Sequence, residues 1–185
     1  MVDMWVWSAV FGGWVGRVLR EMARAVQLRI SEFNAKDIAT TAWEFATLGQ
    51  LDEKLFAALA RAAQLRISEF NAQDIAITAW AFATLGQLDD KLFAALARAA
   101  QLRISEFNAQ GIANSAWAFA TLGQLDDKLF AALARAAQLR ISEFQAQELA
   151  NTAWAFATLG QLDDKLFAAM AGAAQLRISE FKAQN

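Results

Sequence analysis

The sequence predicts an all-α protein, a right-handed α-solenoid of 37-residue helical hairpins, with four full repeats and a degenerate amino-terminal hairpin. One unit recurs along the chain with few changes, and an internal period of this length is typical of helical arrays. Each unit has two segments with helical periodicity, separated by a glycine. Hydrophobic residues make up 57% of the 185 residues, enough to bury a sizeable core. The repeat is marked by Phe33, Phe70, Phe107, Phe144 and Phe181.

Each repeat is expected to form two helices, and the second repeat shows the signals clearly. Asn71 can cap the first helix, and Asp74 lies three residues later, as in a capping box. We expect this helix to end at Gly86, because glycine readily adopts the left-handed conformation that closes a helix. Asp89 is a good cap for the second helix, which is expected to run to about Ile104.

Residues 1–33 are expected to form a degenerate capping hairpin in front of one continuous four-repeat domain at residues 34–185. When the chain is shifted by one repeat, Gly12 aligns with Gly49, and terminal repeats of solenoids are commonly atypical. The apolar run at residues 4–16 is too short to span a bilayer as a helix, so no membrane partner is expected. We expect this apolar hairpin to support end-to-end self-association, and the array to be part of a longer one.

The composition argues against catalysis and metal binding. The chain contains no histidine and no cysteine, so it has no imidazole base, no thiol nucleophile and no His- or Cys-ligated metal. We therefore expect no enzymatic activity, no metal and no cofactor. The formal net charge of −2 at pH 7 is not typical of a protein that binds nucleic acid mainly through phosphate contacts.

Apolar residues occupy a little under half of the circumference of each first helix. In the second repeat this arc includes Ile75, Trp80 and Phe82, whereas Gln73 and Ile77 lie on the facing arc. We interpret the repeated tryptophan as a packing residue and not as a platform for base stacking. Its four copies are Trp43, Trp80, Trp117 and Trp154.

The repeats differ mostly near the start of the first helix, whereas the second helix barely changes. Three variable positions lie on or beside the polar arc of the first helix. They hold Lys36, Gln73, Gln110 and Gln147; then Thr40, Ile77, Asn114 and Asn151; then Glu44, Ala81, Ala118 and Ala155. A constant scaffold with one changeable face suits a modular receptor for an extended ligand. Neutral drift after recent duplication explains the pattern equally well.

Two ladders of arginine run along the second helices. One comprises Arg29, Arg66, Arg103, Arg140 and Arg177, and the other Arg24, Arg61, Arg98 and Arg135. Such ladders suit a phosphate backbone. Arg98 is expected on the outer surface with Lys91, and Arg103 close to the packing seam near Glu106. Roles as ion-pair or helix-dipole partners explain both ladders equally well.

The segment NTAWAFATLG at residues 151–160, with the LDDKLFAALARAA of the repeat unit, resembles the octotricopeptide and heptatricopeptide repeats of organellar proteins, many of which end in a RAP domain. The resemblance covers the chain from residue 34 onward. It implies single-stranded RNA binding in a chloroplast or mitochondrion, in support of RNA processing, stability or translation. It also implies that first-helix residues of each repeat contact one base.

On this resemblance the RNA-binding candidates are Lys36, Thr40, Glu44, Gln73, Ile77, Gln110, Asn114, Gln147 and Asn151. Amide and hydroxyl side chains among them can hydrogen-bond base edges. The sequence contains no RAP-like segment and no clear targeting peptide. Two alternatives stay open: a scaffold whose concave face holds a peptide or helix of a protein partner, and a structural segment without a ligand.

Overall fold

The computed structural model describes residues 3–176, with side chains from residue 16 onward, and every regular element in this range is helical. These residues form the α-helices α1 (Asp3–Arg29), α2 (Ala35–Thr47), α3 (Glu53–Leu65), α4 (Ala72–Thr84), α5 (Asp90–Leu102), α6 (Ala109–Thr121), α7 (Asp127–Leu139), α8 (Ala146–Thr158) and α9 (Asp164–Leu176). Short 3-10 helices follow four of them: η1 (Ile30–Glu32), η2 (Ile67–Glu69), η3 (Ile104–Glu106) and η4 (Ile141–Glu143).

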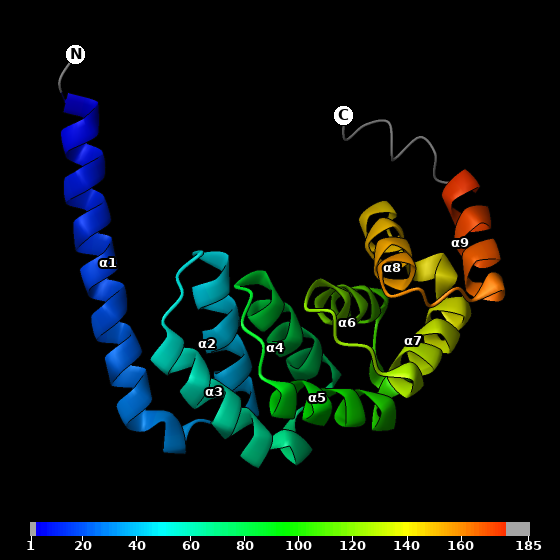
Figure 1. The fold of residues 1–185 in the computed structure, drawn as a ribbon, viewed down its shortest axis with the longest axis horizontal. Helices are drawn as coiled ribbons and strands as arrows, with labels where there is room; N and C mark the ends of the chain where they lie inside the picture. The colour runs from blue at the N-terminus through cyan, green and yellow to red at the C-terminus, as the bar shows by residue number, and fades with distance from the viewer. Residues whose placement is uncertain (1–2, 177–185) are drawn as a thin grey trace.

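The helices form an arch, and the two helices of each hairpin lie on different sides of it (Figure 1). The first helices, α2, α4, α6 and α8, make an inner row, and the second helices, α3, α5, α7 and α9, make an outer row. Neighbouring helices contact one another far more extensively in the inner row than in the outer row. The predicted α-solenoid of stacked hairpins is therefore confirmed.

Helix α4 begins and ends where the sequence signals place it. Asn71 Oδ1 accepts a hydrogen bond from the backbone N–H of Asp74 at 2.9 Å, and Asp74 Oδ2 accepts one from that of Asn71 at 3.1 Å. After the helix, Gly86 has a φ of 65°, a conformation that glycine adopts at little cost. The predicted capping box and glycine stop are both confirmed.

The second helices are capped as expected but end slightly earlier. Asp89 Oδ1 accepts a hydrogen bond from the backbone N–H of Leu92 at 2.8 Å and so caps α5. This helix ends at Leu102, and the expected last turn is the separate 3-10 helix η3. Tightening of this kind is frequent at the carboxyl ends of α-helices.

Aromatic pairs join each outer helix to the inner helix of the next repeat. Phe56 and Phe82 meet edge to face with ring centroids 4.9 Å apart, and both are buried. The same contact recurs at 5.0 Å between Phe93 and Phe119 and between Phe130 and Phe156. Edge-to-face pairs stabilise a core by about 0.5–1.5 kcal/mol beyond their buried area.

Hydrogen bonds also tie each repeat to the next. Gln64 Nε2 donates to the capping carboxylate of Asp89 at 3.2 Å, and the copies of this pair in the next two repeats do the same. Arg103 Nη2 donates to the backbone carbonyl of Ser68, in the preceding repeat, at 3.0 Å. Together these bonds fix the register of neighbouring hairpins.

The expected amino-terminal hairpin is replaced by one continuous helix, α1. Its carboxyl-terminal part packs against α3 and so occupies the place of a second helix. The sequence explains the difference, because Val15 stands at the position of the capping Asp52. Without a capping side chain there, nothing restarts a second helix after Gly12 and Gly13. That prediction was wrong for the part of residues 1–33 that the structure describes.

Candidate functional site

One face of every inner helix stays accessible on the inside of the arch. It is formed by the third, seventh and tenth residues of each repeat, which share a face because they are spaced i, i+4 and i+7. We call this set the concave stripe. It consists of Lys36, Thr40 and Trp43; Gln73, Ile77 and Trp80; Gln110, Asn114 and Trp117; and Gln147, Asn151 and Trp154, all exposed or half-buried.

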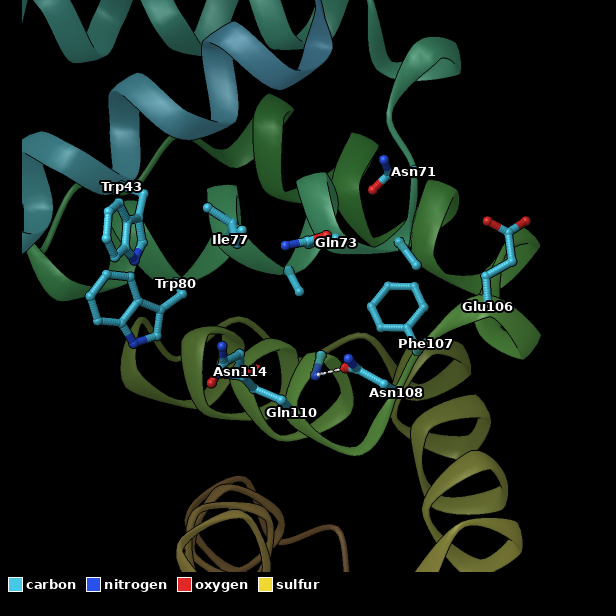
Figure 2. Close-up of a pocket in the computed structure, with 13 residues that line it drawn as sticks. Trp43, Asn71, Gln73, Ile77, Trp80, Glu106, Phe107, Asn108, Gln110 and Asn114 are labelled. Carbon is cyan, nitrogen blue, oxygen red and sulfur yellow. Dashed lines mark hydrogen bonds between the residues drawn. The ribbon is translucent and has the colours of Figure 1, made fainter. Parts of the chain in front are cut away.

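A pocket of about 660 Å³ lies on this face between α4 and α6. Figure 2 shows stripe residues of both helices directed toward it, with Trp43 and Trp80 together at one end. The helix caps Asn71 and Asn108 lie at the other end (Figure 2). The lining comprises Trp43, Asn71, Ala72, Gln73, Ala76, Ile77, Trp80, Glu106, Phe107, Asn108, Gln110, Gly111 and Asn114.

The structure therefore brings four predicted candidates into one pocket: Gln73, Ile77, Gln110 and Asn114. Four others occupy the same stripe outside this pocket. They are Lys36 and Thr40 on α2, and Gln147 and Asn151 on α8. Eight of the nine candidates thus share the concave face.

Glu44, expected on or beside the polar arc of its helix, does not belong to this face. Its equivalents Ala81, Ala118 and Ala155 are 0% exposed, because each faces the preceding inner helix. Glu44 is exposed because no inner helix precedes α2 among the described residues. This carboxylate thus lies on the first helix of the inner row among residues 3–176.

The tryptophans lie on the concave stripe, and not wholly in the core as the sequence suggested. Trp43 and Trp154 are 44% and 46% exposed. Trp80 and Trp117 are half-buried and pack against the core. The sequence suggested burial because alanines surround each tryptophan and make its side of the helix apolar. Part of this side is nevertheless exposed to solvent. Each repeat therefore presents part of an indole ring on the concave face.

The same glutamine–asparagine pair behaves differently in the third and fourth repeats. Gln147 Nε2 donates a hydrogen bond to Asn151 Oδ1 at 2.9 Å, so these two side chains are hydrogen-bonded to each other. Gln110 and Asn114 have the same spacing, but neither side chain forms a hydrogen bond with another described residue. Their amide groups are therefore free to bind a ligand in the pocket.

A glycine further distinguishes the pocket. Gly111 stands where the other repeats have a capping acid: Asp37, Asp74 and Glu148. Asn108 Oδ1 still accepts from the backbone N–H of Gly111 at 2.7 Å. The reciprocal carboxylate is missing, so the pocket lacks the negative charge that the other repeats carry there.

Most described members of the first arginine ladder are used for structure, and its last member, Arg177, lies outside the described residues. Arg66, Arg103 and Arg140 each contact a glutamate three residues later and a serine carbonyl of the preceding repeat. At the exposed pair Arg29–Glu32, 2.6 Å apart, the hydrogen bond and the opposite charge lower the pKa of Glu32 and raise that of Arg29. This ladder is therefore less available to phosphates than the sequence suggested.

The second ladder lies on the outer row, as predicted. Arg61, Arg98 and Arg135 are exposed, and so is Lys91. None of these residues lines the concave pocket. Lys36 is the only lysine or arginine of the concave stripe.

Two negative findings apply to the described residues 3–176. No group of three or more Asp and Glu side chains there could hold a metal ion. No helix in this range is long and apolar enough to cross a membrane.

Comparison with known proteins places the chain among RNA-associated helical-repeat proteins. Residues 16–183 match the family model described as RNA-editing substrate-binding complex 6 protein. This range covers well over half of the chain. Among curated proteins, none matches the chain.

Proposed function

The chain belongs to the family of RNA-editing substrate-binding complex 6 proteins, and on that premise we propose that it binds single-stranded RNA along the concave stripe. The family name supplies the association with RNA-editing substrates. The stripe supplies chemistry that suits unpaired bases, because it combines ring faces with amide donors and acceptors. In this proposal the chain acts by binding and has no catalytic role.

The pocket between α4 and α6 is the observation that carries the proposal. Two consecutive repeats place Gln73, Gln110 and Asn114 around one cavity, and Trp80 lies beside them. Amide side chains can hydrogen-bond the edges of a base, and an indole ring can stack on its face. A base within a duplex offers neither its Watson–Crick edge nor a free face, so the chemistry favours a single strand.

The charge distribution predicts an unusual salt dependence. The stripe contains a single cation, Lys36, and each phosphate neutralised on a single strand contributes a slope of about −0.7 to the dependence of log K on log salt. We therefore expect a slope shallower than about −2, with stacking and hydrogen bonding as the main contributions to affinity.

We propose the mitochondrion as the site of action, because RNA-editing complexes are mitochondrial. The expectation of a chloroplast has no support from the family match. We further propose that RNA binding by this chain supports transcript processing within an editing complex. Assignment to the octotricopeptide type of repeat belongs to the same proposal.

Fluorescence anisotropy with labelled RNA dodecamers tests this function. The unmodified chain should bind a random single-stranded pool more tightly than the matching duplex. Trp80→Leu should weaken single-strand binding about tenfold, because stacking on an aromatic ring contributes about 1–3 kcal/mol per base. Arg98→Ala is the matched control on the outer row, and it should change the affinity less than twofold.

Circular dichroism must show unchanged helicity in each variant. Equal binding by Trp80→Leu and the unmodified chain would exclude the concave stripe as the RNA site. No binding of any RNA at low salt would instead favour the alternative function, a scaffold for a protein partner.

A further inference from the structure

The pocket between α4 and α6 has free amide groups on both of its sides. Gln73 lies on α4, and Gln110 and Asn114 lie on the other side, on α6 (Figure 2). None of these three side chains forms a hydrogen bond with another described residue. Because each amide can donate and accept at once, the pocket can form paired hydrogen bonds with two sides of one ligand.

The neighbouring helices of the inner row do not offer this arrangement. On α2 the equivalent places hold Lys36 and Thr40, and neither is an amide. On α8 the equivalent amides are Gln147 and Asn151, and these are hydrogen-bonded to each other. Among the inner helices that the structure describes, α4 and α6 are thus the pair with unengaged amides on both sides.

The pocket carries little charge with which to select a base. Among the described residues, no lysine or arginine lines it. Its one acidic residue, Glu106, lies at the opposite end from Trp80 (Figure 2), with Oε1 3.5 Å from Nη1 of Arg103. Gly111 stands where α4 has the capping Asp74, so the start of α6 adds no carboxylate. Recognition of a base beside Trp80 therefore falls to the amides.

Adenine is the base whose two polar edges both match an amide. Its Watson–Crick edge has the N1 acceptor beside the N6 amino donor, and its Hoogsteen edge has the N7 acceptor beside the same amino group. Guanine presents two acceptors, N7 and O6, on its Hoogsteen edge, so an amide oxygen there would meet no donor. Cytosine and uracil carry a donor beside an acceptor on one edge only, so a second amide would be left without a matching partner.

We propose that this pocket selects adenine in a single-stranded RNA, with Gln73 bonded to one edge of the base and the amides of α6 to the other. The inference rests on the RNA binding proposed above and adds the identity of one base. Ile77 and Trp80 supply apolar surface on which the ring can lie. One position of the bound RNA is therefore read strictly, and the positions at the other repeats tolerate several bases.

Anisotropy titrations with four labelled dodecamers test the base preference. Each is an oligouridine with adenine, guanine, cytosine or uracil at one central position. The unmodified chain should bind the adenine RNA about tenfold more tightly than the other three, because a bidentate amide contact discriminates strongly between bases. Gln73→Met should reduce this preference to less than about threefold, since methionine keeps the length of the side chain and removes the amide. Gln147→Met, at the equivalent place in the fourth repeat, is the matched control and should retain the preference.

Base analogues test whether both edges are read. Replacing the central adenine by 7-deazaadenine removes the Hoogsteen acceptor, and replacing it by 1-deazaadenine removes the Watson–Crick acceptor. Each replacement should lower the affinity about fivefold, the loss expected for one hydrogen bond. Full affinity with either analogue would overturn the proposal, because one side of the pocket would then not contact the base.

Failure of this inference can be told apart from failure of RNA binding itself. Equal binding of the four dodecamers, or an adenine preference that Gln73→Met leaves intact, would overturn the adenine assignment alone. No binding of any dodecamer would overturn both the assignment and the proposed function. Gln73 and Gln147 are exposed, so neither substitution should disturb the fold, and circular dichroism checks that the helicity is unchanged.

Discussion

Gln147 donates a 2.9 Å hydrogen bond to Asn151 across one turn of α8, whereas the same two residue types one repeat earlier leave each other free. In the earlier repeat, Gln110 and Asn114 line the concave pocket. The same two residue types thus serve two purposes. In the fourth repeat the two side chains are hydrogen-bonded to each other, and in the third repeat they are available to a ligand. The repeats are nearly identical in sequence but not equivalent as binding positions.

Asn114→Ala should therefore reduce RNA affinity more than Asn151→Ala. A hydrogen bond to a base contributes about 1 kcal/mol, so we expect a loss of about fivefold for Asn114→Ala. For Asn151→Ala we expect less than twofold, because that amide oxygen already accepts from Gln147. Anisotropy titrations of both variants with one RNA pool make the comparison. Equal losses at the two sites would contradict it.

Gly111→Asp should stabilise the protein and weaken RNA binding. A glycine within a helix costs about 0.5–1 kcal/mol relative to alanine, and the aspartate would restore the capping box that Asn71 and Asp74 form in α4. We expect an increase of about 1–2 kcal/mol in the free energy of unfolding, measured by urea denaturation. The added carboxylate lies in the pocket and should repel RNA.

Gly111→Ala is the matched control for the charge. A Cβ there would lie 3.2 Å from Phe107 Cδ1 and from Asn108 Oδ1, contacts that the repeats with an acid at this position accommodate. This variant should gain part of the stability and retain RNA affinity within about twofold. If Gly111→Ala weakens RNA binding as much as Gly111→Asp does, then RNA affinity depends on the space left by the glycine and not on the charge.

Thr78→Val should leave the stability unchanged or raise it. The hydroxyl of Thr78 is fully buried and has no hydrogen-bond partner, and an unpaired buried hydroxyl costs about 1–3 kcal/mol. Valine keeps the shape and removes the polar atom, so we expect a gain of about 0.5–1 kcal/mol in thermal or urea unfolding. Thr84→Val, on an exposed site of α4, should change the stability much less. A loss of stability at Thr78 alone would reveal a partner for its hydroxyl.

Arg103→Ala should destabilise the protein, whereas Arg98→Ala should not. Arg103 bonds the carbonyl of Ser68 at 3.0 Å and joins two repeats, so its removal should cost about 1 kcal/mol, a figure reduced for its partial exposure. Arg98 is exposed and forms no hydrogen bond or ion pair with another described residue. Urea unfolding of both variants tests the difference. Equal stabilities would show that the bond to Ser68 contributes nothing.

The repeat and its turn signals were sufficient to predict most of the fold. Asn71, Gly86 and Asp89 act through local backbone chemistry, so their roles follow from neighbouring residues alone. The amino-terminal hairpin was mispredicted because the shifted alignment gave weight to Gly12 and overlooked the missing cap at Val15. A glycine can sit within a helix, and without a cap after it no new helix has to begin.

The site was predicted less completely, because it depends on which helix lies on each side. Gln73 and Gln110 were found from their variation between repeats. The burial of Ala81 and the partial exposure of Trp80 depend on contacts between adjacent repeats, which residue periodicity within one helix does not specify. One sequence signal was available, since Trp80 lies at i+7 from Gln73 and i+3 from Ile77 and so shares their face.

The buried alanines between neighbouring inner helices determine how strongly the arch curves. Inner neighbours approach through buried alanines such as Ala76 and Ala83, whereas outer neighbours touch sparsely. The inner row is therefore shorter than the outer row, and the arch curves toward the inner row. Bulkier side chains at these alanines would separate the inner helices, reduce the curvature of the arch and move the tryptophans apart. The spacing of the concave stripe can therefore be changed without substituting any residue of the stripe itself.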